Sequence, residues 1–230
     1  MFGGGLFDMC PETLKTTLKR FCIVVIFGVA FAYIEAAVVV YLRTIFHPGG
    51  FDFPLADFAA SPFWKPLLLT EIGREAATIV LIFTAAWLFG QGHQQRFACF
   101  LTIFAVWDIF YYVWLKVLLD WPASIMDWDI LFLMPVAWAS PVLAPLLVSI
   151  TLLVFAVIIL YRCSCAKPIR VTPAEWMGFC AAGLIVAVSF GIAGLRIAKP
   201  DFKSHFYWPL FAAGGILALA LFFRCLLRSR

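Results

Sequence analysis

Residues 21–42 have the sequence FCIVVIFGVAFAYIEAAVVVYL, an apolar run with a single charged residue, Glu35. A helix needs about 20 apolar residues to cross the roughly 30 Å hydrocarbon layer of a bilayer, so this run predicts a transmembrane helix. The run is too long for the apolar part of a secretory signal peptide, and we therefore expect it to be retained as a helix. This stretch decides the fold class, which is that of an integral membrane protein.

The composition of the whole chain agrees with that prediction. Of its 230 residues, 64% are hydrophobic and 13% are charged, which would leave very large apolar patches on a soluble domain. We expect an all-α, polytopic fold in which residues 1–230 form a single membrane domain. The predicted transmembrane helices are residues 21–42, 66–89, 97–119, 141–161, 176–195 and 207–223.

The fourth apolar region is too long for one straight crossing. It runs from Ile130 to Tyr161 and contains Pro135, Pro141 and Pro145. Because proline breaks or kinks a helix, we expect a short interfacial or re-entrant segment before the fourth helix.

Positive charges predict the orientation, since cytoplasmic segments are enriched in lysine and arginine. With the N-terminus inside, ten such residues fall on the cytoplasmic side and five on the opposite side. The first group is Lys15, Lys19, Arg20, Arg96, Arg162, Lys167, Arg170, Arg224, Arg228 and Arg230; the second is Arg43, Lys65, Arg196, Lys199 and Lys203. This bias predicts a multi-pass protein of the cell membrane with both termini in the cytoplasm.

The acidic residues gather on the other side. Of thirteen, only Asp8, Glu12 and Glu175 would lie toward the cytoplasm. An ionised carboxylate near the middle of a bilayer costs about 2.5 to 3.5 kcal/mol unless it is paired, hydrated or protonated. The rise of an α-helix places Glu35, Glu75 and Asp108 at comparable depths of roughly 10 to 16 Å.

Two predicted helices carry a polar face. In the second, Glu71, Arg74 and Glu75 share one side, which favours an ion pair between Arg74 and Glu71. In the third, Asp108 shares a face with Tyr111 and Tyr112, which supply two hydroxyl groups. Lys116 lies one turn further along and is a further expected partner of the cluster, whereas the acids of the Asp127-Trp128-Asp129 segment are expected to be solvated.

These residues form the candidate site. Its proposed catalytic or ligand-binding side chains are Glu35, Glu71, Arg74, Glu75, Asp108, Tyr111 and Tyr112, and its proposed metal ligands are Glu35, Glu71, Glu75 and Asp108. A site rich in carboxylates and poor in histidine suits Mg²⁺, Mn²⁺ or Ca²⁺. Two alternatives remain open, a polar network that only fixes helix packing and a proton relay.

Three functions fit this site. The first is a membrane-embedded enzyme or binding protein that holds a divalent cation, a lipid-like or isoprenoid ligand, or both. The second is a small proton- or cation-coupled transporter, and the third is an accessory subunit of a larger membrane complex. The expected partners are the lipid bilayer and a second copy of the chain or a membrane-complex subunit; nothing indicates nucleic-acid binding.

Overall fold

The computed structural model describes residues 11–46, 64–197 and 205–229. This part of the chain contains six helices that are long and apolar enough to cross a membrane, which confirms the predicted class of integral membrane protein. Their bounds are α1 Pro11–Phe46, α3 Trp64–Phe89, α4 His93–Leu119, α5 Leu143–Ser164, α6 Pro173–Gly194 and α7 Trp208–Arg228.

Several helices extend beyond their predicted ends. The largest difference is in α1, which begins at Pro11 instead of residue 21 and continues to Phe46, so that it includes Arg43. The α6 helix begins earlier than expected because Thr172 and Glu175 form a capping box, in which the Thr172 hydroxyl accepts from the Glu175 N–H at 3.3 Å. The α4 helix ends at Leu119 as predicted, and Asp120 follows it with a left-handed backbone at φ 53°.

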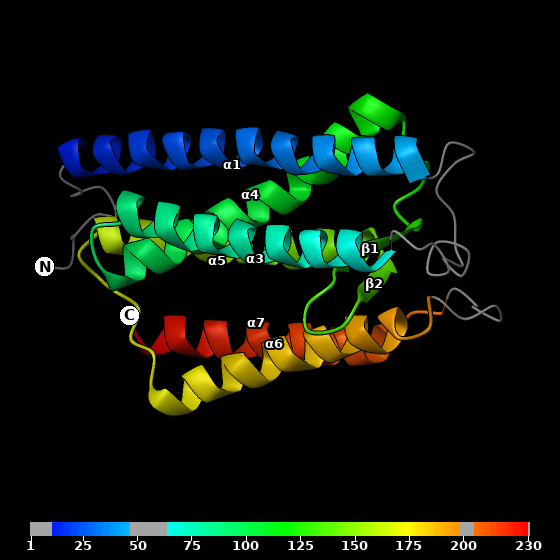
Figure 1. Ribbon diagram of the computed structural model, residues 1–230. Helices are drawn as coiled ribbons and strands as arrows, with labels where there is room; N and C mark the ends of the chain where they lie inside the picture. Colours follow the sequence, from blue (N-terminus) through cyan, green and yellow to red (C-terminus); the bar gives the residue numbers. More distant parts are fainter. Residues whose placement is uncertain (1–10, 47–63, 198–204, 230) are drawn as a thin grey trace, which may run out of the picture.

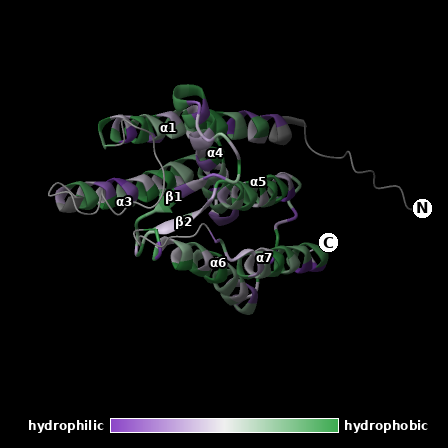
Figure 2. Ribbon diagram, turned by 90° about the vertical axis from the view of Figure 1, so that its right-hand side faces the viewer, coloured by the Kyte–Doolittle hydropathy of each residue, from purple (hydrophilic) through white to green (hydrophobic). Residues whose placement is uncertain are grey.

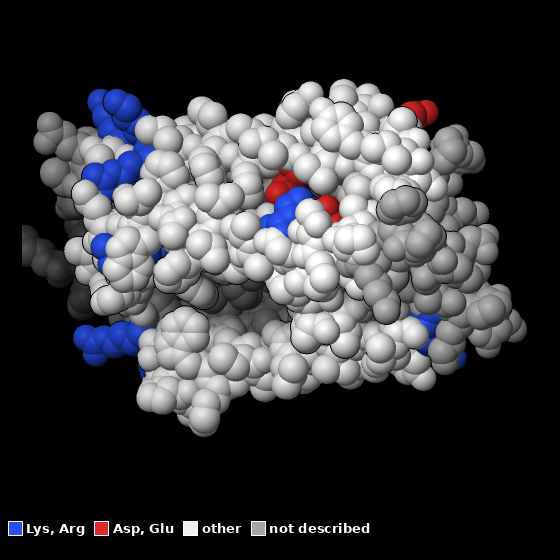
Figure 3. Space-filling view, viewed as in Figure 1, with Lys and Arg blue, Asp and Glu red and all other residues white. Residues whose placement is uncertain are grey.

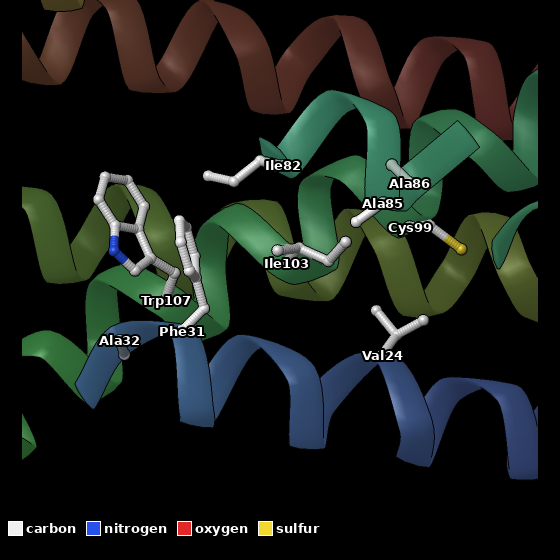
Figure 4. Packing of buried hydrophobic residues seen from close by; sticks show 9 residues of the cluster. All are labelled: Val24, Phe31, Ala32, Ile82, Ala85, Ala86, Cys99, Ile103 and Trp107. Atoms are coloured by element: carbon white, nitrogen blue, oxygen red, sulfur yellow. The ribbon is translucent and has the colours of Figure 1, made fainter. Parts of the chain in front are cut away.

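The α4 helix lies at the centre of the bundle and packs against α1, α3 and α5 (Figure 1). Between α1, α3 and α4 lies an apolar core that Figure 4 shows from close by. Small side chains on α1 and α3 let the three helices approach closely around the larger Ile103 and Trp107 of α4. The core residues are Val24, Phe31, Ala32, Ile82, Ala85, Ala86, Cys99, Ile103 and Trp107.

A β-hairpin precedes α5, where the sequence predicts a short interfacial or re-entrant segment. Strands β1 (Trp128–Phe132) and β2 (Trp138–Pro141) pair antiparallel, with Asp129 opposite Ser140. Pro135 lies in the connecting turn and Pro141 at the strand end, positions at which a missing N–H breaks no interior pairing. The prolines therefore favour a hairpin as well as a broken helix.

The chain runs back and forth, so that the start of α1 and the end of α7 lie at the same end of the bundle (Figure 1). Basic side chains gather at this end, on the left of Figure 3, and we call it the basic end. The opposite end, where β1 and β2 lie, is called the hairpin end. Figure 2 shows that apolar residues prevail along the helices between the two ends.

The α6 and α7 helices form a pair that contacts the rest of the bundle at two places. Toward the basic end, Phe155 of α5 stacks on Phe222 of α7, with ring centroids 3.9 Å apart. At the hairpin end, α6 packs against β2, and Gly194 lies against the Ala137 carbonyl. Between these two places a cavity separates the α6–α7 pair from α4 and α5.

Close packing at Gly194 gives a stability prediction. A Cβ atom added there would lie 1.7 Å from the Ala137 oxygen, so Gly194→Ala forces the hairpin away from α6. We expect the variant to lose about 1–3 kcal/mol of unfolding free energy, measured by thermal or denaturant unfolding in detergent. Gly73→Ala is the control, because a Cβ there meets no atom within 4 Å. Equal stability of both variants would contradict the described contact.

Candidate functional site

Arg74 joins two helices through two carboxylates. Its Nε donates to Glu71 Oε2 at 2.8 Å within α3, which confirms the pair predicted from their spacing. Its Nη1 donates to Glu35 Oε2 of α1, and Thr78 Oγ1 donates to the other Glu35 oxygen at 2.9 Å. Figure 3 shows a cluster of acidic and basic side chains in the middle of the face, surrounded by uncharged residues. Two carboxylates thus share one guanidinium, which leaves this group with a net negative charge when both acids are ionised.

Glu75 serves a different partner. Both of its carboxylate oxygens accept from the backbone N–H of Leu133, at 3.1 and 2.9 Å. Leu133 follows β1 directly, so the bond ties α3 to the turn of the hairpin. Glu75 is buried, and the N–H of a turn residue replaces the water that it loses.

Asp108 is held by a hydroxyl group. Ser149 Oγ of α5 donates to Asp108 Oδ2 at 2.8 Å. Hydroxyls inside helices commonly bond to the carbonyl four residues back, as those of Thr84 and Thr102 do here. Ser149 instead bridges two helices, and Asp108 has no lysine or arginine within ion-pair distance among the described residues.

Arg43 and Asp129 form a buried ion pair that the sequence analysis did not predict. Arg43 Nη2 donates to Asp129 Oδ1 at 3.0 Å, and the guanidinium lies 3.8 Å from the centroid of Trp121. The Asp129 side chain is 3% exposed, so the expectation that it is solvated is wrong. Burial raises the pKa of the Asp129 carboxyl to about 6, although Arg43 opposes that rise. Asp127, by contrast, accepts from the Ala123 and Ser124 N–H groups in the exposed loop.

Of the other predicted partners of Asp108, Tyr111 and Tyr112 line the cavity with it and Lys116 does not. The ring centroids of the two tyrosines lie 5.0 Å apart, with an interplanar angle of 77°. Lys116 does not join this group, and the expectation that it does is wrong. It pairs with Asp120 at 2.7 Å at the exposed end of α4, where an ammonium on a flexible stem stays hydrated.

A cavity of about 1010 Å³ lies between the centre of the bundle and the α6–α7 pair. Polar side chains line one part of its wall: Glu35, Arg74, Glu75, Thr78, Asp108, Tyr111, Tyr112 and Ser149. The rest is mostly apolar, with Phe, Leu, Ile and Val side chains from α4, α5, α6 and α7. Figure 3 shows the face hollowed between α3 and the α6–α7 pair, next to the central cluster of acidic and basic side chains.

Small residues give this cavity its width. The spacing of glycines and alanines on α6 and α7 favours close helix contact, and Gly214 does pack against Val186 and Ala182 of α6. Gly183 and Gly215 line the cavity as Gly214 does, but a Cβ at either of these two positions would meet no atom within 4 Å. The two glycines therefore leave space open on the wall formed by α6 and α7.

No protein-family model, no curated protein and no solved structure matches this chain. The function is therefore argued from the site alone. Glu35, Glu75 and Asp108 line one cavity, and each has its own hydrogen-bond partner. Within residues 11–46, 64–197 and 205–229, no group of three or more His, Cys, Asp or Glu side chains could hold a metal ion. The predicted Mg²⁺, Mn²⁺ or Ca²⁺ site thus has no support from the described side chains.

Thr78 and Ser149 belong to the candidate site, and the sequence analysis did not predict them. Thr78 follows Arg74 by four positions and Glu75 by three, so its place on the polar face of α3 was open to prediction. Ser149 lies in an apolar helix with no neighbouring charge, and only the packing of α5 on α4 brings it to Asp108. Nothing in the sequence around Ser149 indicates its contact with Asp108.

Proposed function

We propose that this membrane protein binds an amphiphilic molecule of the bilayer in the cavity between its central helices and the α6–α7 pair. The observation that carries the proposal is the composition of the cavity wall, which is mostly apolar with a few convergent polar groups around Arg74 and Asp108. That combination is typical of small-molecule sites, where apolar surface provides affinity and a few polar groups set orientation. The hydrocarbon part would lie along α5, α6 and α7.

The size of the cavity supports a ligand with a long apolar part. Ligand pockets usually measure about 300–1,000 Å³, and this cavity of about 1010 Å³ lies at the upper limit. Its hollow opens between helices that carry exposed large apolar side chains, among them Phe83 and Trp87 on α3 and Leu184 on α6. Such surfaces face lipid in a membrane protein, so an amphiphile would enter sideways from the bilayer.

Gly183→Leu tests the proposal by filling the cavity. Because no atom lies within 4 Å of the new Cβ and Gly183 lines the cavity, we expect the leucine side chain to extend into the space of the ligand. We expect the wild-type protein to retain a bound amphiphile through detergent purification, detected by mass spectrometry of the extracted lipids. The leucine and the amphiphile would then compete for the same space. Such overpacking costs about 1–3 kcal/mol, here of binding free energy, so the variant should retain roughly tenfold less amphiphile than the wild type.

Gly73→Leu is the matched control for this test. Its Cβ also meets open space, but Gly73 does not line the cavity, so retention should equal that of the wild type. Equal retention in the Gly183 variant would show that the amphiphile binds on the outer surface. A wild-type protein that holds none after exposure to a lipid extract would refute the proposal.

A further inference from the structure

The carboxylates that line the cavity differ in how many of their oxygens accept a hydrogen bond. Glu35 is engaged by Arg74 and Thr78, and Glu75 accepts from the Leu133 N–H on both oxygens. Asp108 accepts on Oδ2 alone, from a neutral hydroxyl, and its side chain is only partly buried. Among the described acids of the cavity wall, Asp108 is therefore the one with a carboxylate oxygen left to contact a ligand.

The surroundings of Asp108 are aromatic. Phe104 precedes it by four positions on α4, and Tyr111 and Tyr112 follow by three and four, so all three share its helix face. All three also line the cavity. The faces of aromatic rings attract cations, and a carboxylate beside such rings is the combination that recognises ammonium groups.

The charge of the cavity wall points the same way. Three of its described residues are carboxylates, Glu35, Glu75 and Asp108, while Arg74 is its one arginine and is already shared with Glu71. A phosphate or carboxylate head group would meet uncompensated negative charge here, and in apolar surroundings like charges repel strongly. A positively charged group would be attracted.

We infer that Asp108 binds the polar group of the ligand and that this group is a protonated amine on a long-chain amphiphile. The inference rests on the proposed binding of an amphiphile in the same cavity. The ammonium donates to the free oxygen of Asp108 and lies against the Phe104, Tyr111 and Tyr112 rings. Ser149 is a positioning residue, because its hydroxyl holds the other oxygen and fixes the orientation of the carboxylate.

Three probes with the same diazirine-bearing alkyl chain test this inference, one ending in an amine, one in an alcohol and one in a phosphate. Each is added to the full-length protein in lipid nanodiscs, and crosslinking to cavity-lining peptides is measured against concentration. A charge-assisted contact favours the amine over the alcohol roughly tenfold to a hundredfold in half-saturating concentration. The phosphate should crosslink least.

Asp108→Asn keeps the shape of the side chain and its bond to Ser149 but removes the charge. We expect the variant to bind the amine and the alcohol equally well. Asp120→Asn, at the exposed end of the same helix, should keep the wild-type preference. The amine-to-alcohol ratio within one sample does not change with a fraction of misfolded protein, so a less stable variant still gives a result.

The outcomes separate the two proposals. If all three probes crosslink and Gly183→Leu strongly reduces the crosslinking, but the amine has no advantage, the cavity binds amphiphiles and the proposed role of Asp108 is wrong. A preference for the phosphate, or an amine preference that survives in Asp108→Asn, also overturns the inference. If none of the probes labels cavity-lining peptides in the wild type, amphiphile binding itself is refuted.

Discussion

Arg43→Met is expected to lower the free energy of unfolding by about 3–5 kcal/mol, because it leaves the carboxylate of Asp129 buried without its charged partner. Arg43 and Asp129 are both buried, and their 3.0 Å contact joins the end of α1 to strand β1. The measurement is denaturant unfolding in detergent, compared with Lys116→Met. That control breaks the exposed pair with Asp120, and surface pairs contribute only about 0–1 kcal/mol.

The loss in Arg43→Met should depend on pH. Burial already raises the pKa of Asp129 to about 6, and Arg43 holds it from rising further, so the variant has a still higher folded pKa. A carboxyl group whose pKa is raised on folding loses stability as pH increases through that raised value. The variant should therefore differ more from the wild type at pH 8 than at pH 5.

Asp129→Asn provides the second half of this test. Combined with Arg43→Met it removes the buried charge, so the double variant should recover a large part of the lost stability and its pH dependence. If the double variant is as unstable as Arg43→Met, the lost contact of Arg43 with Trp121, rather than the ion pair, explains the effect.

Arg74→Met is expected to lower the free energy of unfolding by a similar amount, about 3–5 kcal/mol, because it removes the charged partner of two carboxylates at once. The Arg74 side chain is 25% exposed, while those of Glu35 and Glu71 are 8% and 13% exposed. Glu35 is the more buried acid and links α1 to α3, so we expect its lost partner to account for most of the loss. Unfolding in detergent, with circular dichroism at fixed pH, measures the change.

A double variant separates packing from ligand binding at this position. Arg74→Met combined with Glu35→Gln should be more stable than Arg74→Met alone, because glutamine still accepts from Thr78 without a charge. An Arg74→Met protein of unchanged stability would contradict the structural role. In that case the arginine would serve the ligand rather than the junction of the helices.

The transmembrane framework was predictable because it depends on local properties. Apolar length and helix-breaking residues identify all six helices, and the ion pair between Glu71 and Arg74 follows from their spacing in α3. The α4 helix ends at Leu119, the predicted end. In each case the residues concerned are neighbours along the chain.

The rest of the site depends on residues far apart in sequence. Arg74 with Glu35, Glu75 with Leu133 and Ser149 with Asp108 meet only after the helices pack. The hairpin was missed because its aromatic strands resemble an apolar helix segment, and hydropathy does not distinguish them. Lys116 was expected to join the cluster because it follows Asp108 on the same helix, but its ammonium pairs with Asp120 at the exposed end of α4.

The order of the chain has a consequence for biosynthesis. The polar side chains of the cavity wall belong to α1, α3, α4 and α5, which all precede α6 and α7 in the chain. Because chains fold from the N-terminus as they are made, the polar side chains and the wall formed by the central helices are complete before α6 and α7 are synthesised. An amphiphile that occupies the unfinished site would be enclosed during synthesis, and it would hold the last two helices in place as they insert.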